Sequence, residues 1–211
     1  MPNDVSVDFE MFNEAANNNG PFILSELRRL LPDAGHVLEM GSGSGQHVAF
    51  FAGQIPGIVW QPTDKEPCFD PLCRNLEQLN LPNILIPQYL DIEAFQVNGH
   101  YGAIYCANVI HIMKESLIEP MFEGIAETLK APGLFVVYGP FKYDGKFTTP
   151  SNARFDDWLK SRDPLSGIRD IERLQSAASH KGLELIEDVA MPANNQLLVF
   201  HKTDLRQGTC D

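Results

Sequence analysis

The sequence lacks the features that mark secreted proteins, membrane-spanning proteins and metal-binding domains. No apolar run is long enough to span a bilayer, and the first ten residues lack the basic and apolar regions of a signal peptide. The four cysteines show no metal-ligand spacing: Cys68, Cys73, Cys106 and Cys210. We therefore expect reduced thiols, no metal site and a cytoplasmic location.

Positive charge is also scarce. The chain has 16 Lys and Arg residues against 28 Asp and Glu residues, and its formal net charge is -12. The only adjacent cationic pair is Arg28-Arg29, and such a surface repels nucleic acids over most of its area. We expect neither a nucleic-acid nor a membrane partner. A small molecule, or a protein side chain, suits this composition better, and the oligomeric state is open.

Apolar segments alternate with helical patterns along the chain. Its 211 residues are 44% hydrophobic, which suits one domain with a large core. The alternation predicts an α/β fold with a Rossmann-like, doubly wound parallel sheet. Strands are expected over 36–40, 58–63, 84–90, 103–107, 134–138, 183–190 and 196–202. Helices are expected over 21–31, 46–54, 70–79, 115–130, 153–159 and 171–180.

Two connections stand out from this alternation. The stretch "MPANN" is short and predicts that the last two strands form an antiparallel pair. The connection over 142–170 is long and punctuated by Gly and Pro, which is typical of a functional segment. We divide the single expected domain, 1–211, into an N-terminal lid and helix region, a cofactor-binding core, a substrate-side insertion, a terminal helix with a strand pair, and a tail: 1–35, 36–140, 141–170, 171–203 and 204–211.

The stretch "HVLEMGSGSGQH" places Gly41, Gly43 and Gly45 after the first strand. Glycine there permits unusual φ values and lets a ligand approach the main chain. A dinucleotide fingerprint needs glycine at the sixth position, where Gln46 stands, and a phosphate-binding loop needs a Gly-Lys-Ser/Thr sequence that is absent. A purely structural turn remains an alternative.

Carboxylates end the next two strands. Asp64 lies at the second strand end, where an acidic side chain can accept hydrogen bonds from ribose hydroxyls. Asp91 ends the third strand and either meets an adenine amino group or caps the strand end. Behind the glycines, Gln46 is a candidate contact for a ligand bound at this turn, and His47 is expected to face solvent or cap a neighbour.

The order of these motifs resembles the S-adenosylmethionine (SAM) binding core of class I methyltransferases. The match rests on E-x-G-x-G-x-G after the first strand and on the acidic end of the second, and it covers about 36–140. The resemblance implies a seven-stranded sheet whose last strand is antiparallel, with SAM bound and S-adenosylhomocysteine (SAH) as its product. It implies cofactor contacts from Glu39, Gly41, Ser42, Gly43, Gly45, Gln46, Asp64, Asp91 and Asn108.

A narrower resemblance covers almost the whole chain. The stretches "GSGSGQHVAFFA", "WQPTD", "NVIHI", "YGPFKYDGKFTTPSNARFD", "RDPLSGIRD" and "MPANNQLLVFHK" together resemble the poorly characterised family that includes methyltransferase-like protein 26. That family carries an Arg-Asn pair before the proline of its first helix, whereas this chain has Asn17-Asn18 ahead of Pro21. The resemblance implies a fold and a cofactor but names no substrate.

Candidate catalytic residues follow the fourth and fifth strands. His111 is a candidate general base or a structural histidine, and Asn108 would hold cofactor or substrate or cap a turn. "ANVI" lacks the Asn-Pro-Pro-aromatic arrangement that methylates planar amides and adenine amines. Tyr138 ends the fifth strand, where an aromatic wall could contact a sulfonium.

Candidate substrate contacts come from the flanking segments. Phe141 follows the fifth strand and is either a wall of the site or a core aromatic residue. Asn152 and Asn194 stand in expected turns, where Asn also serves the backbone itself. Asn18 belongs to an Asn-rich segment that would form a lid or a frayed terminus.

Three functions compete on this basis. The leading interpretation is a SAM-dependent methyltransferase whose acceptor is a small molecule. The second is a non-catalytic SAM- or SAH-binding regulatory protein, because no unambiguous catalytic pair is present. The third is a nicotinamide oxidoreductase, which lacks the sixth-position glycine and a Tyr-x-x-x-Lys set.

Overall fold

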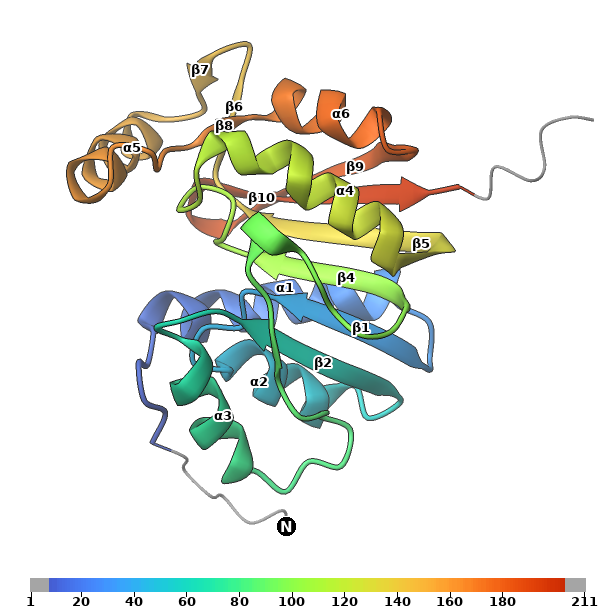
Figure 1. Ribbon diagram of the computed structural model, residues 1–211. Helices are drawn as coiled ribbons and strands as arrows, with labels where there is room; N and C mark the ends of the chain where they lie inside the picture. The colour runs from blue at the N-terminus through green and yellow to red at the C-terminus, as the bar shows by residue number, and fades with distance from the viewer. Residues whose placement is uncertain (1–7, 204–211) are drawn as a thin grey trace, which may run out of the picture. The chain divides into compact units, whose positions relative to one another are not determined.

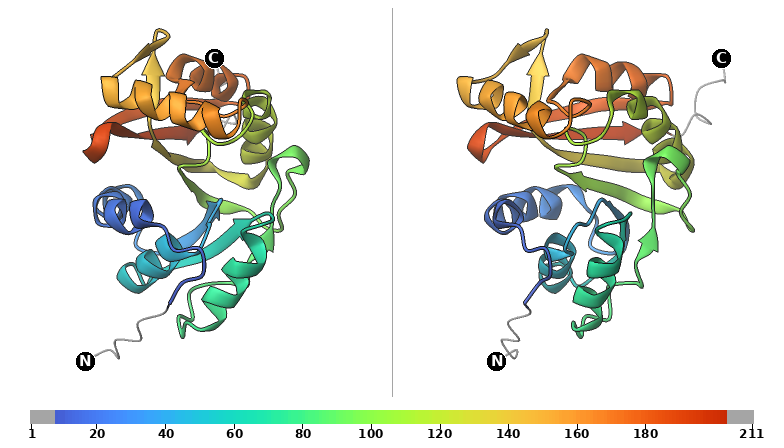
Figure 2. Two further views of the ribbon diagram at one scale, coloured as in Figure 1. Left: turned by 90° about the vertical axis from the view of Figure 1, so that its left-hand side faces the viewer. Right: turned by 60° about the vertical axis from the view of Figure 1, so that its left-hand side comes forward.

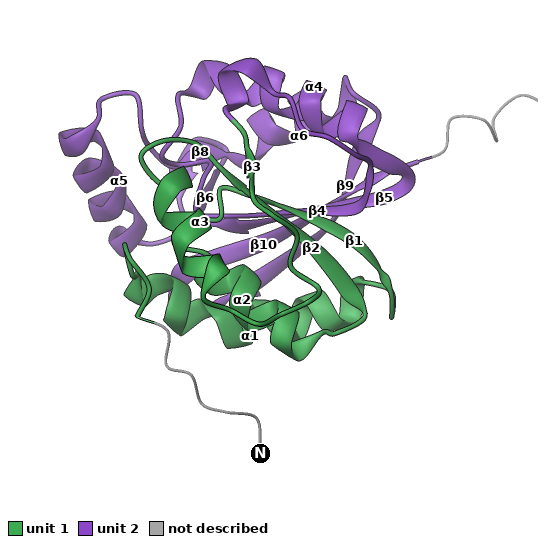
Figure 3. Cartoon of the chain, turned by 60° about the horizontal axis from the view of Figure 1, so that its bottom comes forward, with its two compact units in different colours: residues 1–90 green, residues 91–211 purple. Residues whose placement is uncertain are grey.

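The computed structural model describes residues 8–203 (Figures 1 and 2). The chain divides into two compact units, residues 1–90 and residues 91–211 (Figure 3). Within the described residues, no helix has both the length and the apolar character that a bilayer span requires.

Unit 1 is built from parallel strands and the helices that connect them. Its elements are α1 (Glu14–Leu30), β1 (Gly35–Met40), α2 (Gln46–Gln54), β2 (Ile58–Asp64), α3 (Phe69–Glu77) and β3 (Gln88–Tyr89). β1 pairs parallel with β2, and β2 pairs parallel with β3. Phe51 of α2 packs against Trp60 of β2 with ring centroids 5.6 Å apart, and both side chains are fully buried. This contact fixes α2 on the sheet behind the glycine turn.

Unit 2 combines parallel and antiparallel strands. Its elements are η1 (Ile92–Ala94), β4 (Tyr101–Ala107), η2 (Glu115–Leu117), α4 (Ile118–Thr128), β5 (Leu129–Gly139), β6 (Phe141–Tyr143), β7 (Lys146–Phe147), α5 (Pro150–Arg162), β8 (Arg169–Asp170), α6 (Ile171–Ser179), β9 (Leu183–Met191), η3 (Pro192–Asn194) and β10 (Asn195–Lys202). Phe122, Phe135 and Phe200 pack together with ring centroids 5.4–5.8 Å apart. These rings join α4 to β5 and β10.

The strand order confirms the expected fold class. The main sheet has seven strands in the order β3-β2-β1-β4-β5-β10-β9. β10 is antiparallel to both β5 and β9, so the last strand runs against the parallel ones, as predicted. A second sheet, β7-β6-β8, has three strands and was not expected.

The first helix begins earlier than the sequence predicts. α1 starts at Glu14, and its N-cap is Asn13, whose Oδ1 accepts from the Ala15 N–H over 2.8 Å. Pro21 therefore lies inside the helix instead of in its first turn. The expected range 21–31 was wrong, because the Asn-rich stretch 17–19 already belongs to this helix, which docks on α2. A Cβ on the buried Gly20 would lie 3.3 Å from the Phe50 ring, so the two helices approach closely there.

Two other expected boundaries were also wrong. The strand expected over 84–90 is reduced to β3 and an isolated bridge between Ile84 and Trp60, because Pro62 and Pro87 have no N–H with which to continue the ladder between them. The helix expected over 153–159 is longer, since Thr149 caps α5 at Pro150. The rest of the long connection contains the small sheet, which lies at the same end of unit 2 as α5 (Figures 1 and 2).

Candidate functional site

The turn between β1 and α2 holds three glycines in the left-handed backbone region. Gly41, Gly43 and Gly45 have φ values of 74°, 56° and 84°. The Gly43 N–H donates to Oδ2 of Asp64 over 2.6 Å, and the Ser42 N–H donates to a carbonyl of β2 over 2.8 Å. Residues with a Cβ rarely adopt this backbone conformation, so the shape of the turn requires glycine.

Two of these glycines have different surroundings. A Cβ on Gly45 would lie 3.0 Å from side-chain atoms of both Leu72 and Leu76, so this glycine allows α3 to pack on the turn. In the described part of the chain, a Cβ on Gly43 would have no atom within 4 Å other than those of its chain neighbours. Gly43 therefore presents bare backbone to open space, which suits a ligand that approaches the main chain.

Asp64 stands beside this open space. Its Oδ2 accepts from the Gly43 N–H, and its Oδ1 accepts from the Lys65 N–H over 2.8 Å. Burial raises the pKa of Asp64, while the two backbone hydrogen bonds lower it. Each carboxylate oxygen keeps a further lone pair, so the group can still accept hydrogen bonds from a diol.

Glu39 is a buried carboxyl group at the end of β1. Its exposed fraction is 2%, and its Oε2 has no hydrogen-bond partner among residues 8–203. Burial raises the pKa of Glu39 to about 8, although a hydrogen bond with Ser42 lowers it. An unpaired buried carboxyl group is costly, and a cationic ligand group would stabilise its ionised form.

The segment over residues 10–13, which we call the strap, is fastened behind the glycine turn. Gln46 Oε1 accepts from the Asn13 N–H over 2.7 Å, and Gln46 Nε2 donates to the Asn13 carbonyl over 3.2 Å. Asn75 makes the same two-point contact with the Glu10 backbone, at 2.9 and 3.0 Å, and also donates to the Ser44 carbonyl over 2.8 Å. The Gln46 amide is thus engaged by the strap.

Replacing Asn75 with alanine should destabilise unit 1 markedly. The side chain is fully buried and makes three hydrogen bonds, so its removal deprives the buried Ser44 carbonyl and the Glu10 backbone of these partners. We expect a loss of about 2–4 kcal/mol in the free energy of unfolding, measured with urea. Asn80→Ala, at an exposed position, is the control and should change this value little. Equal losses in the two variants would contradict a fastening role for Asn75.

His47 was expected either to face solvent or to cap a neighbour, and the first of these alternatives is wrong. It is 7% exposed, and its Nε2 lies 3.1 Å from the Ala16 carbonyl and 2.7 Å from Asn19 Oδ1. Burial lowers the pKa of His47 to about 4, so the ring is neutral near pH 7. This histidine joins α2 to α1. Asn18, a predicted substrate contact, is exposed on α1.

In unit 2, three predicted residues lie at the ends of β4 and β5: Asn108 and His111 follow β4, and Tyr138 is near the end of β5. Asn108 has a left-handed backbone, with φ 60°, and its N–H donates to the Tyr138 carbonyl over 2.9 Å. Tyr138 is itself buried. Asp91, the other acidic strand end, caps η1 by accepting from the Glu93 N–H over 3.1 Å. The strained Asn108 marks a sharp turn that leads the chain to His111.

His111 is a buried imidazole without a hydrogen bond. Its exposed fraction is 7%, and neither ring nitrogen has a hydrogen-bond partner in the described part of the chain. Its ring meets the edge of Phe155 with centroids 5.4 Å apart. Burial, together with the charge of Arg169, lowers the pKa of His111 to about 4. The neutral ring is therefore able to accept a hydrogen bond.

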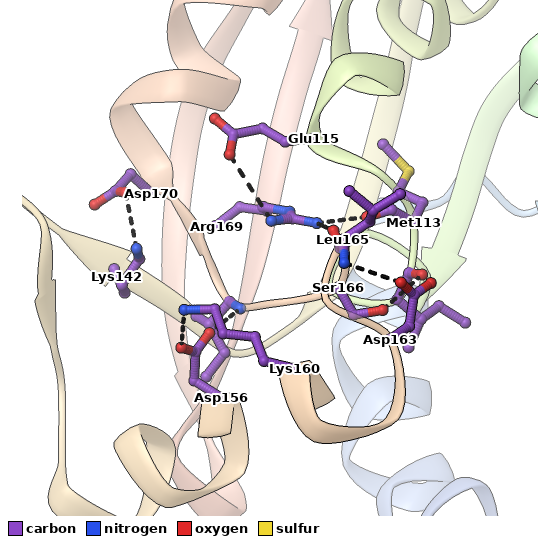
Figure 4. Close-up of polar contacts among 12 residues, drawn as sticks. Met113, Glu115, Lys142, Asp156, Lys160, Asp163, Leu165, Ser166, Arg169 and Asp170 are labelled. Atoms are coloured by element: carbon purple, nitrogen blue, oxygen red, sulfur yellow. Dashed lines mark hydrogen bonds and ion pairs between the residues drawn. The ribbon is translucent and has the colours of Figure 1, made fainter. Parts of the chain in front are cut away.

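Arg169, which the sequence analysis missed, holds the surroundings of His111 in place (Figure 4). Its Nη2 donates to the carbonyls of Met113 and Leu165. The Gly167 N–H donates to the His111 carbonyl over 2.8 Å, and Ser166 Oγ donates to the next carbonyl along the chain over 3.1 Å. The segment before β8 is thereby tied to the segment after β4. In the sequence, Arg169 lies in the stretch "RDPLSGIRD", which carries part of the family resemblance but indicates no such role.

Asp156 supports the same segment from α5. It is 2% exposed; its Oδ1 accepts from the Ile168 N–H over 2.7 Å, and its Oδ2 pairs with Lys160 at 2.6 Å (Figure 4). Asn152, also on α5, donates to the Asn194 carbonyl over 2.9 Å, so the structure brings these two predicted residues together. Phe141 is fully buried and packs in the core.

Comparison with known structures assigns the class of fold. The chain has the class I methyltransferase fold, and the family described as "Protein of unknown function (DUF938)" matches residues 10–202. The chain therefore belongs to that family. The narrower resemblance to the family of methyltransferase-like protein 26 stays a prediction.

Three similar structures illustrate the fold. Human N-acetylserotonin methyltransferase in complex with SAM has a TM-score of 0.75 at 15% identity, over 90% of this chain and 53% of that one. The methyltransferase SibL in its apo form gives 0.75 at 15%, over 90% and 56%. An O-methyltransferase family 2 protein from Planctomyces limnophilus, in complex with apigenin, gives 0.70 at 14%, over 88% and 62%. This chain thus spans little more than half of their length.

Proposed function

We propose that the protein is a SAM-dependent methyltransferase that acts on a small-molecule acceptor. The observation that carries the proposal is the open turn at Gly43, beside the carboxyl groups of Asp64 and Glu39. The names of the structural neighbours, which include SAM and SAH complexes and O-methyltransferases, support it.

The residues of unit 1 fit this cofactor. Asp64 has lone pairs left for ribose hydroxyls, and Gly43 leaves room for the adenosyl group against the main chain. The unpaired Oε2 of Glu39 suits the ammonium group of the methionine part. Gln46 fits less well than predicted, because its amide already pairs with the strap. When bound, SAM supplies a methyl group activated by its sulfonium.

The acceptor side of the reaction would use unit 2. His111 is buried and neutral, and its ring nitrogens have no hydrogen-bond partner among residues 8–203, so one of them can accept a hydrogen bond from an acceptor hydroxyl. Phe155 packs against the imidazole in a T-shaped contact, which helps to keep water away. Near the same strand ends, Asn108 and Tyr138 would contact the cofactor or the acceptor. Asn152 and Asn194 would orient the acceptor.

A thermal-shift experiment tests the cofactor. At 100 times its Kd, SAH should stabilise the protein by about 2.7 kcal/mol, which for a chain of this size raises Tm by roughly 5–10 °C. NAD at the same concentration should give no shift. If SAM and SAH gave neither a shift nor binding heat in calorimetry, the proposal would fail. Transfer of a labelled methyl group from SAM to the small-molecule fraction of a cell extract then separates catalysis from binding alone.

A further inference from the structure

Gly139, at the end of β5, has open space above it beside His111. Gly139 is buried, and its backbone does not lie in the left-handed region, so its conformation does not require glycine. Apart from its chain neighbours, a Cβ at this position would have one heavy atom within 4 Å, Nδ1 of His111 at 3.6 Å. The missing side chain thus leaves room next to an imidazole nitrogen.

Gln196 faces the same space from the neighbouring strand. β10 lies beside β5 in the main sheet (Figure 1). In the antiparallel register of this pair, Gln196 stands directly opposite Gly139. Side chains of directly opposite residues leave the sheet on the same face, with Cβ atoms about 4.5–5.5 Å apart. The Gln196 side chain therefore lies on the face where His111 lies. Its Oε1 is buried and has no hydrogen-bond partner among residues 8–203.

We propose that His111 and Gln196 form a binding site for the methyl acceptor over Gly139, and that this acceptor carries two adjacent hydrogen-bond donors. The inference rests on the proposed function and adds the chemical class of its substrate. A neutral imidazole has one accepting nitrogen, and the glutamine oxygen is a second acceptor. A ligand with one donor would satisfy only one of them, whereas a vicinal pair of hydroxyls would satisfy both.

The surroundings favour a planar compound of this class. Phe155 meets the His111 ring edge-on and stacks on Trp158 with centroids 5.6 Å apart, so aromatic surface continues outward from the imidazole. The nearby charge of Arg169 favours a bound hydroxyl that is partly ionised. Catechol, a flat ring with two adjacent hydroxyls, is therefore the simplest probe, and guaiacol, its mono-methyl ether, is the matched compound with one donor.

The test follows the ring signals of His111 by NMR, in protein held under nitrogen with SAH added. We expect catechol to shift these signals saturably and to bind roughly tenfold more tightly than guaiacol. Gln196→Leu should remove this preference. Gly139→Leu should abolish both responses, because the side chain fills the space. Gly139→Ala, whose Cβ makes an ordinary contact, should weaken them less. Gly53→Leu, in open space on α2, should behave like the wild type.

The outcomes separate this inference from the proposed function. Unchanged catechol binding in Gly139→Leu, or an unchanged preference in Gln196→Leu, would overturn the inference even if SAH binds. The absence of any His111 response to catechol would overturn it as well. Absence of SAH binding would instead count against the proposed function, while the catechol response of His111 would still support the site over Gly139. SAH binding by the Gly139 and Gln196 variants should match that of the wild type.

Discussion

Gly43→Val should abolish the stabilisation of the protein by SAH, although the variant still folds. Apart from its chain neighbours, no atom of residues 8–203 lies within 4 Å of a Cβ at Gly43, so the valine methyl groups would occupy the space assigned to the ligand. Placing a residue with a Cβ in this left-handed backbone region, with φ 56°, lowers the free energy of unfolding by about 1–2 kcal/mol. A domain of ordinary stability tolerates this loss. The SAH-dependent rise in Tm, roughly 5–10 °C for the wild type, should vanish.

Gly182→Val is the matched control for this experiment. Gly182 also has a left-handed backbone, with φ 74°, and a Cβ there likewise meets nothing within 4 Å, but it follows α6 in unit 2. The two variants should therefore lose similar stability without ligand, and only Gly43→Val should lose the response to SAH. Gly45→Ala should destabilise the protein more, because its Cβ would press on Leu72 and Leu76. A full SAH response in Gly43→Val would mean that the ligand does not lie on this turn.

The sequence predicts unit 1 well where its signals are local. β1, α2 and β2 begin and end within about a residue of the expected positions, because an apolar run, a glycine turn and a terminal aspartate follow one another directly. The pairing of Gly43 with Asp64 was foreseeable for the same reason, since parallel neighbouring strands bring their ends together. α1 was misjudged because Pro21 suggested a start, whereas the cap at Asn13 and the docking on α2 decide it.

The surroundings of His111 could not be predicted in the same way. Arg169 reaches carbonyls 56 and 4 residues away in the chain, and Gln196 meets Gly139 only through the register of β5 and β10. Asn75 similarly holds Glu10 across 65 residues. Although Arg169 and Gln196 lie in stretches that carry the family resemblance, nothing in these stretches indicates such contacts, and the roles of all three side chains depend on the folded backbone. His111 itself was named from the sequence, but only the folded chain shows that its ring nitrogens have no hydrogen-bond partner among residues 8–203.

The wild type should lose stability as the pH rises, because the buried Glu39 must ionise, and Glu39→Gln should not show this loss. Burial raises the pKa of Glu39 from its ordinary 4.5 to about 8, so the folded state holds this proton more tightly than the unfolded state. The resulting stability is fully present below pH 4.5 and is lost as the pH rises through 8. It is on the order of 5 kcal/mol. Because the buried histidines also titrate, the informative quantity is the difference in unfolding free energy between variant and wild type, measured with urea from pH 5 to pH 9.

That difference should grow steadily in favour of the glutamine variant up to about pH 8 and then level off. Asn80→Ala, at an exposed position and without a titrating group, should leave the difference flat across the range. A flat difference for Glu39→Gln would mean that the buried carboxyl group is stabilised as an anion by contacts other than those described.

The same carboxyl group should link cofactor binding to proton release. At pH 7, Glu39 is mostly protonated, and an ammonium group beside its unpaired Oε2 would favour ionisation, so SAH binding should release up to about one proton. Calorimetry in phosphate and in Tris buffer reports this as a difference in heat. Adenosine, which lacks the ammonium group, should show no such difference, and Glu39→Gln should bind SAH roughly tenfold more weakly without releasing the proton. Equal heats in both buffers for the wild type would place the ammonium group elsewhere and leave Gly43 and Asp64 to hold the nucleoside alone.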